Sequence, residues 1–254
     1  RWLHLPVLAV VPRFRAIGGK RSMFAKIGPN YKESKEEAGT AQGWDLPRHT
    51  RDYYDTMCEL LLSSTPPYNG NPVIIGVTSW ERGEGVSTVA ANLGVTLAAH
   101  DGHVLLVETD VRNPTAQKVF AQASGGGFTE IDVDGVGRAT VLQHNLSLLP
   151  ANAVTDPQNE MPVPLRCYTD FLTQSEKLQE YGFIVVDMPP LNKGAGALRL
   201  AKLVNHVVMV IESEKHPRDV VLQGKEMLEY VHSNIIGAVL NKHRRYGPKS
   251  AYRT

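Results

Sequence analysis

Residues 78–88 read Thr-Ser-Trp-Glu-Arg-Gly-Glu-Gly-Val-Ser-Thr, and this stretch decides the fold of the 254-residue chain. An apolar run over residues 72–77 precedes it, and a helical pattern over residues 89–99 follows it. A strand, a glycine-rich turn and a helix form a phosphate-binding loop, in which backbone N–H groups and a helix N-terminus face an anion. Such loops end on Gly-Lys-Ser/Thr. Here Val86 stands at the lysine position, so the sequence predicts a nucleotide scaffold without its principal cation.

Three residues of this loop, Gly83, Gly85 and Ser87, suit a bound phosphate and its metal ion. Gly83 and Gly85 permit positive φ and a close approach of the backbone to an anion. Ser87 stands where such loops present a hydroxyl to Mg²⁺. A Gly-x-Gly pair alone favours an ordinary strand-to-helix turn, but the following Ser-Thr and helix favour the phosphate loop. The residues predicted to bind nucleotide here are Arg82, Gly83, Glu84, Gly85, Val86, Ser87 and Thr88.

Acidic residues end two other predicted strands. Glu108 and Asp110 follow the apolar run 103–107, and Asp187 follows the run 183–186. Carboxylates placed opposite a phosphate loop hold Mg²⁺ or accept a proton. The plainer interpretations are a solvated acidic turn for the first pair and a polar strand end for Asp187. Their combination with a phosphate loop favours the metal-binding arrangement.

Composition limits the classes of protein that fit. Apolar residues make up 42% of the chain, and 27 basic residues nearly balance 26 acidic ones. The chain can therefore bury a sizeable core. Because its charges are balanced, its net charge does not indicate a nucleic-acid partner. Cys58 and Cys167 form no spacing motif, which indicates a reducing compartment. No apolar run reaches membrane-spanning length, and the first residue, Arg1, suggests a fragment of a longer protein.

Short apolar strands alternate with helices from residue 72 onward. Strands are predicted over residues 73–78, 103–108, 146–149, 183–187, 206–212 and 235–241. Helices are predicted over residues 87–99, 115–123, 165–180, 196–203 and 218–233. Continuous apolar strands suit a parallel sheet that is covered on both faces. We therefore predict a doubly wound α/β domain with a mostly parallel sheet of the P-loop NTPase type, and ligands beyond the carboxyl ends of its strands.

The N-terminal part reads differently. Residues 1–45 are predicted to be an N-terminal segment and linker, with a short strand within residues 5–12 that ends at a proline. A charged, glycine-containing stretch follows and is typical of a solvated linker. A helix is predicted over residues 47–63. The sheet thus has an extended and helical N-terminal appendage before its first strand of residues 73–78, and we place the P-loop domain at residues 46–254.

Together these motifs resemble those of the bacterial tyrosine kinases, the cytoplasmic autokinase domains of capsule and exopolysaccharide export systems. Residues 83–93 resemble the Walker A segment, residues 104–114 the second Walker motif and residues 184–190 Walker B. Residues 237–241 are similar to the strand whose terminal Asn, here Asn241, contacts the nucleotide base in related ATPases. Residues 5–12 are similar to the segment after the second membrane helix of the forms that are fused to a chain-length regulator.

The resemblance implies a function and its residues. ATP or ADP and Mg²⁺ would be the cofactors, and tyrosine phosphorylation the reaction. Glu108, Asp110 and Asp187 would be catalytic, with Ser87, Asp110 and Asp187 at the metal. Tyr246 and Tyr252 are the candidate phosphate acceptors in the C-terminal tail. The implied partner is the membrane segment of a polysaccharide co-polymerase, fused or separate, at the cytoplasmic face of the bacterial inner or plasma membrane; a homo-oligomer is a further candidate assembly.

Departures from the family pattern bear on activity. One charge at ~4 Å is worth roughly 4 kcal/mol at an effective dielectric near 20, so Val86 is predicted to lower the rate by ~10²–10³. Arg82 is the nearest cation in sequence, and Glu81 stands where the related partition ATPases carry a signature lysine. The family's ring-forming arginines are absent from residues 52–58, and Gly196 replaces an acid.

Three functional interpretations remain open. The first is a catalytically impaired kinase-family domain with a structural or regulatory role in polysaccharide export. The second is an active tyrosine kinase in which Arg82 or Lys193 supplies the lost charge. The third is a partition or septum-positioning ATPase, against which Glu81 and the entry segment 5–12 count.

Overall fold

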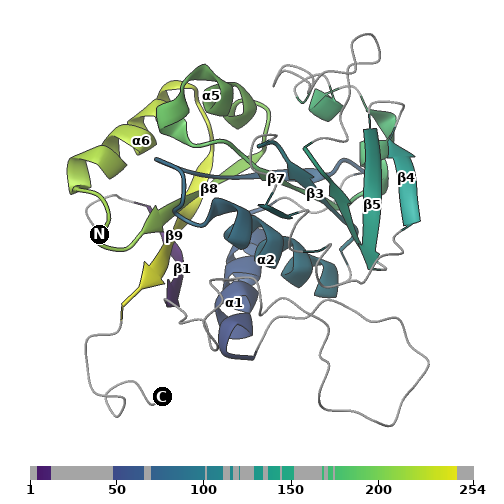
Figure 1. Ribbon diagram of the computed structural model, residues 1–254, viewed down its shortest axis with the longest axis horizontal. Coiled ribbons are helices and arrows are strands. Elements are labelled where there is room, and N and C mark those ends of the chain that lie inside the picture. The colour runs from purple at the N-terminus through teal and green to yellow at the C-terminus, as the bar shows by residue number, and fades with distance from the viewer. Residues whose placement is uncertain are drawn as a thin grey trace.

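The computed structural model describes residues 5–12, 48–65, 70–100, 102–110, 115–116, 120, 129–133, 137–143, 145–151, 168, 171–173 and 175–244. These residues build one nine-stranded sheet with the strand order β1-β9-β8-β2-β7-β3-β6-β5-β4 (Figure 1). The strands are β1 Val7–Pro12, β2 Val73–Ser79, β3 Val104–Glu108, β4 Thr129–Val133, β5 Gly137–Gln143, β6 Leu146–Leu149, β7 Phe183–Asp187, β8 His206–Glu212 and β9 Ile235–His243. All neighbouring strands from β1 to β6 in this order pair in parallel, and β6, β5 and β4 pair antiparallel.

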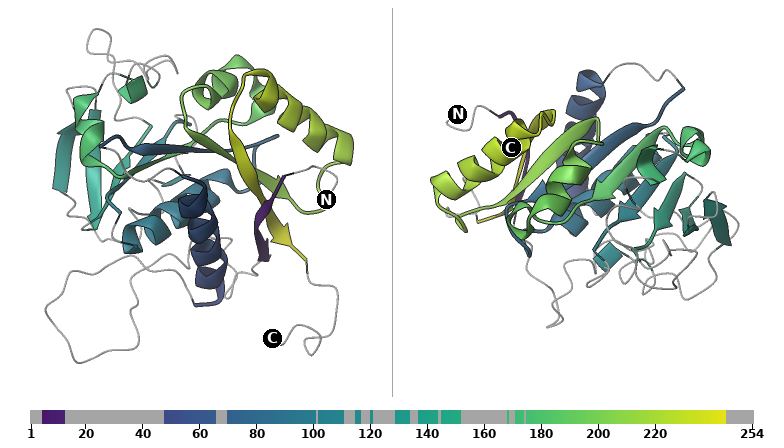
Figure 2. Two further views of the ribbon diagram at one scale, coloured as in Figure 1. Left: turned by 180° about the vertical axis from the view of Figure 1, so that it is seen from behind. Right: turned by 90° about the horizontal axis from the view of Figure 1, so that it is seen from above.

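Helices cover both faces of the sheet, which confirms the predicted doubly wound α/β class. The α-helices are α1 Arg48–Ser64, α2 Val86–Ala99, α5 Ala195–Ala201 and α6 Arg218–Tyr230, and the 3₁₀ helices are η1 Glu176–Glu180 and η2 Leu191–Lys193. Helices α1 and α2 lie on one face and α5 and α6 on the other (Figures 1 and 2). Ligands of such folds bind beyond the carboxyl ends of the parallel strands.

The parallel strands are apolar because each faces a core on both sides. In β3, Val104 and Leu106 belong to the core under α1 and α2, whereas Leu105 and Val107 belong to the core under α5 and α6. This alternation follows from the two-residue period of a strand. Burial on both faces explains the uninterrupted apolar runs that identify these strands in the sequence.

Helix α1 and strand β1 extend this architecture toward the N-terminus. The buried face of α1 carries Tyr54, Met57, Cys58 and Leu61, which join the core under α2. Strand β1 pairs in parallel with β9 at the edge of the sheet. The predicted N-terminal strand is thus confirmed, while the predicted linker lies outside the described residues. The division of the chain at residue 45 stays a prediction.

Several element predictions need correction. Strands β4 and β5 are not among the predicted strands, because their apolar residues alternate with polar ones and form no continuous apolar run. The predicted helix 165–180 ends in the 3₁₀ helix η1, and in residues 165–175 the structure describes helix only at 168 and 171–173. Helix α6 stops at Tyr230, because His232 takes a positive φ of 58°. The predicted helix 115–123 needs no correction: residues 115–116 and 120, the part of it that the structure describes, are helical.

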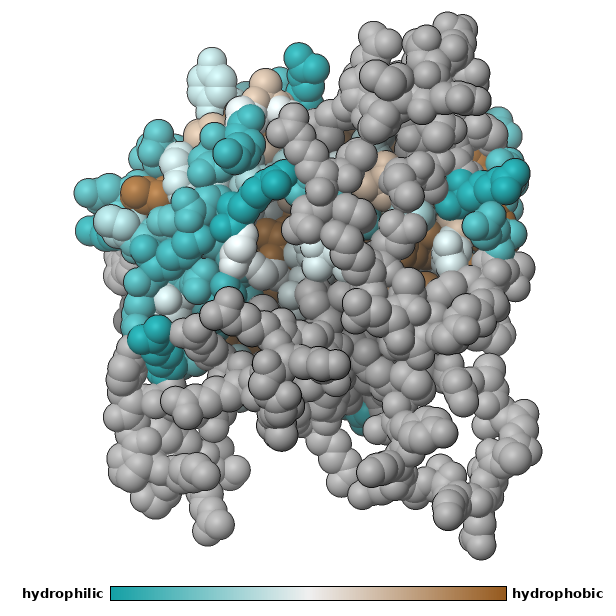
Figure 3. Space-filling model, viewed as in Figure 1, coloured by the Kyte–Doolittle hydropathy of each residue, from teal (hydrophilic) through white to brown (hydrophobic). Residues whose placement is uncertain are grey.

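No helix among the described residues combines the length and the apolar character that crossing a membrane requires. The surface seen in Figure 3 carries polar side chains over α6 and the adjoining strand ends, with isolated apolar spots between them.

Candidate functional site

The phosphate loop lies between β2, which ends at Ser79, and α2, which begins at Val86. Gly83 and Gly85 have φ values of 86° and 100°, which L side chains rarely adopt. A Cβ at Gly85 would also lie 2.1 Å from Nδ2 of Asn241. Both the left-handed backbone and the close approach of Asn241 therefore require glycine at residue 85.

The N-terminus of α2 faces this loop. Gly85 is its N-cap, and no side chain makes a capping hydrogen bond there. The first N–H groups of a helix have no partner within the helix, and the helix dipole adds a partial positive charge at the same end. The loop thus ends in a helix terminus without a side-chain cap, where an anion could bind. That the loop binds nucleotide stays a prediction.

Asp187 lies beside the loop in a buried position. It is the last residue of β7, and it pairs in register with Glu108 at the end of β3. The Asp187 carboxylate accepts a hydrogen bond from Ser87 of α2. Its pKa is raised to about 7, chiefly by burial; the Ser87 hydrogen bond lowers it, and the negative charges of Glu108 and Asp110 raise it. A cation in this position would relieve the charge that burial and its neighbours disfavour.

The other two predicted acids have different surroundings. Glu108 is fully buried, and its Oε1 accepts the backbone N–H of Ala116 at 2.7 Å. Asp110 is partly exposed and forms an ion pair with Arg82 of the loop at 2.7 Å. The structure therefore brings all three predicted carboxylates to one side of the loop. The guanidinium group of Arg82, a candidate replacement for the missing lysine, is thus already paired with Asp110.

These residues fit Mg²⁺ through the Ser87 hydroxyl and the carboxylates of Asp187 and Asp110, all oxygen donors of the kind this ion prefers. Within the described part of the chain, no group of three or more His, Cys, Asp or Glu residues could hold a metal ion by itself. A nucleotide's phosphates would have to complete such a site, as is usual for Mg²⁺. The assignment of Ser87, Asp110 and Asp187 to a metal stays a prediction.

Val86 occupies the first position of α2 and packs, partly buried, against the core under α1 and α2. Its hydrocarbon side chain is thus part of the packing at the place where the motif has a lysine. Lys193, a candidate replacement, lies exposed in η2. Lys215 and Lys242 contact backbone carbonyl groups of the loop.

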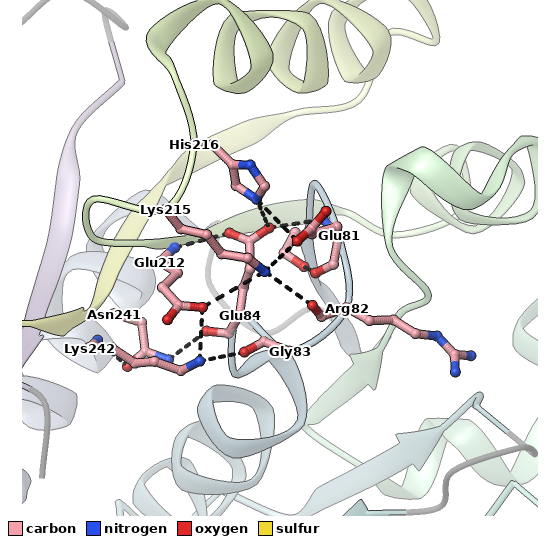
Figure 4. Close-up of polar contacts among 10 residues, drawn as sticks. Glu81, Arg82, Gly83, Glu84, Glu212, Lys215, His216, Asn241 and Lys242 are labelled. Atoms are coloured by element: carbon pink, nitrogen blue, oxygen red, sulfur yellow. Dashed lines mark hydrogen bonds and ion pairs between the residues drawn. The ribbon is translucent and has the colours of Figure 1, made fainter. Parts of the chain in front are cut away.

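A network of charged side chains holds the loop against β8 and β9 (Figure 4). At its centre is the buried carboxylate of Glu84, which accepts the backbone N–H groups of Glu81 at 2.9 Å and Glu212 at 3.0 Å. His216 Nε2 lies 3.3 Å from Glu84 Oε1. Lys215, His216 and Lys242 are not among the predicted site residues, because they lie more than a hundred residues from the loop and no local motif marks them.

Asn241 also holds the loop. Its Nδ2 donates to the carbonyl oxygen of Glu84 at 2.7 Å, and its Oδ1 accepts the N–H of Lys242. The predicted contact between Asn241 and a nucleotide base stays a prediction. Tyr246 and Tyr252, the candidate phosphate acceptors, lie outside the described residues.

A family model described as ParA, NUBPL iron-transfer P-loop NTPase, matches residues 72–253. The chain belongs to the ParA family of P-loop NTPases. The match covers the loop, all three predicted acids and Asn241, so the family assignment rests on the segment that builds the site.

Among curated relatives of this ParA-family chain are bacterial tyrosine-protein kinases. YwqD of Bacillus subtilis is 29% identical over 180 residues, which cover 67% of this chain and 75% of YwqD. CpsD of Streptococcus agalactiae is 26% identical over 174 residues, which cover 66% of this chain and 75% of CpsD. These homologues confirm the resemblance to the bacterial tyrosine kinases.

Solved structures share the fold. The chimerical protein CapA2B2 superposes with a TM-score of 0.67 at 23% identity, covering 96% of this chain and 97% of CapA2B2. The kinase domain of the Escherichia coli tyrosine kinase ETK gives 0.63 at 18% identity, covering 96% and 93%. MinD of Pyrococcus horikoshii, solved with Mg-ADP, gives 0.53 at 22% identity, covering 71% and 75%. The first two alignments include nearly the whole chain.

Proposed function

We propose that this chain is a nucleotide-binding domain of the bacterial tyrosine-kinase type in which phosphoryl transfer is impaired, and that it acts as a structural or regulatory part of a polysaccharide export system. The observation that carries this proposal is Val86. It stands at the start of α2, beside Ser87 and next to the glycine loop, and its side chain packs against the core. The phosphate loop is retained, but it lacks the lysine whose charge would compensate that of the transferred phosphoryl group.

Retention of nucleotide is supported by the parts of the site that do not need the lysine. The positive φ values of Gly83 and Gly85 and the N-terminus of α2 suit a phosphate. Asp187 and Ser87 are in contact, as metal-binding residues of a P-loop should be. We therefore expect ADP or ATP to bind with Mg²⁺.

Loss of transfer is supported by the placement of the remaining cations. Catalysis of phosphoryl transfer depends almost entirely on positioning and on charge stabilisation. Arg82 is held by Asp110 at 2.7 Å, so it would have to leave that ion pair to reach a γ-phosphate. An active kinase that uses Arg82 is the alternative, since a metal that takes Asp110 would release the guanidinium.

The export setting is proposed from the relatives. One of them, ExoP of Rhizobium meliloti, a succinoglycan biosynthesis transport protein, is 24% identical over 173 residues, which cover 66% of this chain and 22% of ExoP. We propose that this chain works with the membrane segment of a polysaccharide co-polymerase, fused or separate, at the cytoplasmic face of the bacterial membrane. A homo-oligomer in that setting is part of the same proposal.

Iron transfer, named in the description of the family model, does not fit the cysteines. The chain contains only Cys58 and Cys167, and iron–sulfur clusters are held by thiolates. Cys58 is fully buried, and burial raises the pKa of its thiol to about 12. A cysteine enclosed in the core and one other cysteine do not supply the exposed set of thiolates that such a cluster needs.

The experiment that tests the proposal measures binding and transfer separately. Isothermal titration calorimetry with ADP and Mg²⁺ is expected to show binding, and incubation with γ-labelled ATP is expected to leave the protein unlabelled. Robust labelling of the wild type that disappears in Asp110→Ala would reject the proposal and support the active kinase. Dimerisation that requires nucleotide would instead support a partition-type ATPase.

A further inference from the structure

Three successive carbonyl groups of the phosphate loop are held by side chains from the ends of β8 and β9. Lys215 Nζ donates to the carbonyl oxygen of Arg82 at 3.2 Å, and Lys242 Nζ donates to that of Gly83. Asn241 Nδ2 donates to that of Glu84 at 2.7 Å. Figure 4 shows all three donors on the same side of the loop.

The direction of these carbonyl groups fixes the direction of three N–H groups. In a planar trans peptide, the C=O of one residue and the N–H of the next point in opposite directions. Holding the carbonyls of residues 82–84 toward β8 and β9 therefore turns the N–H groups of Gly83, Glu84 and Gly85 away from those strands. Successive N–H groups that point to one side form an anion-binding nest.

The donors are themselves held in position. Lys242 Nζ lies 2.9 Å from a Glu212 carboxylate oxygen. Lys215 Nζ lies 2.6 Å from Glu81 and 3.8 Å from Glu212. Lys242 also has a φ of 56°, an uncommon value for a residue with a side chain, at the point where its ammonium group reaches the loop. Strained backbone of this kind is retained where the surroundings require it, often at functional sites.

We infer that Lys215 and Lys242, together with Asn241, are positioning residues that hold the loop's N–H groups toward a bound phosphate. An ammonium group on a carbonyl oxygen polarises the peptide and strengthens its N–H as a donor. This inference rests on the proposed retention of nucleotide. The two lysines affect how tightly the loop binds the phosphate groups of that nucleotide.

The test replaces each lysine by Met, which keeps the length of the side chain and removes its charge. Lys242→Met and Lys215→Met are each expected to weaken binding of ADP with Mg²⁺ on the order of tenfold, and the double variant more, because each substitution removes a charge-assisted hydrogen bond that holds a loop peptide in place. Lys242→Arg is expected to restore most of the affinity. Lys225→Met is the matched control, since Lys225 pairs with Glu229 on α6 and does not contact the loop.

Adenosine separates this role from a general effect on the fold. It carries no phosphate, so its affinity is expected to be the same in the wild type and in the double variant. Equal loss of ADP and adenosine affinity would overturn the inference, as would an unchanged ADP affinity in the double variant. If the double variant does not fold, the comparison of Lys242→Met with Lys242→Arg decides the same question.

Backbone ¹⁵N relaxation of the free protein distinguishes failure of this inference from failure of the proposed function. The order parameters of Gly83, Glu84 and Gly85 are expected to fall from about 0.85 toward about 0.6 in the double variant, as in a loop that loses its anchors. If the wild type binds no ADP, the proposed nucleotide binding is wrong, and this fall still supports the positioning role. Unchanged order parameters in that case would overturn it.

Discussion

Asp187 shows how single residues of this site are placed at a cost to stability. Its carboxyl is buried at the end of β7, near the carboxylates of Glu108 and Asp110, and its pKa is raised to about 7. The negative charge of this carboxylate is unfavourable there unless a cation compensates it. Groups with shifted pKa values of this kind gather at functional sites.

The first prediction concerns Asp187→Asn and pH. Because the pKa of Asp187 is raised, the folded protein keeps a proton that the unfolded chain loses near pH 4, so stability falls as pH rises from about 4 to about 7. The loss amounts to up to about 4 kcal/mol. Asp187→Asn is expected to flatten this pH dependence and to raise the free energy of unfolding at pH 8, as measured by urea denaturation.

Exposed Asp52 on α1 provides the control. Asp52→Asn is expected to leave the pH profile of the wild type in place. The same Asp187→Asn variant should lose the Mg²⁺ dependence of ADP binding, because a carboxamide is a weaker ligand for this cation than a carboxylate. A variant that is less stable than the wild type at pH 8 would show that the buried charge is already compensated.

At the scale of elements, the strand, loop and helix of the site are specified locally, whereas the anchors of the loop are not. The apolar run before residue 79 and the glycines at 83 and 85 identify the phosphate loop in the sequence. Lys242 is 159 residues away from Gly83, and it reaches the loop only because β9 and β8 lie beside β2 in the sheet. Sequence patterns identify elements by local periodicity, and they contain no signal for such distant pairs.

The hairpin of β4 and β5 illustrates a second limit. Its residues alternate between polar and apolar types, as in Thr129–Val133, and the three strands at this end of the sheet pair antiparallel. The parallel strands were predicted from continuous apolar runs, which arise from burial on both faces. The signal that could have identified the hairpin is the alternation of apolar and polar residues, which indicates strands that are buried on one face only.

The second prediction compares two glycines of the loop. Gly83→Ala is expected to cost about 1 kcal/mol, from positive φ alone, because nothing lies within 4 Å of the added Cβ. Gly85→Ala is expected to cost about 2–4 kcal/mol, since the Cβ must also displace the buried amide of Asn241 from the Glu84 carbonyl. Urea denaturation measures both values. Equal costs would show that Asn241 is not held at the loop.

At the scale of the whole molecule, the N-terminal strand supports the site through the sheet. Strand β1 pairs with β9, and β9 carries Asn241 and Lys242 at its end. Leu8 is buried in the core under α1 and α2, and a Cβ at Gly237 of β9 would lie 2.5 Å from its Cγ. The entry segment is therefore packed tightly against the strand that anchors the loop.

The third prediction tests this support. Leu8→Ala is expected to lower the free energy of unfolding by about 2–4 kcal/mol through loss of buried contacts. It should also weaken ADP binding by disturbing β9. Val10→Ala on the same strand is the control, because Val10 is 39% exposed and its truncation is expected to cost less than about 1 kcal/mol. Equal effects of the two variants on denaturation midpoints would contradict this account.

Whether Val86 impairs phosphoryl transfer is tested most directly by comparing Val86→Lys and Val86→Met with the wild type in transfer of labelled phosphate from ATP. The two side chains have similar length, and only lysine adds charge. We expect Val86→Lys to raise the rate by ~10²–10³ and Val86→Met to leave it near the wild-type level, because only a charge at this position compensates the transferred phosphoryl group. Strong labelling of the wild type, changed little by Val86→Lys, would contradict the account.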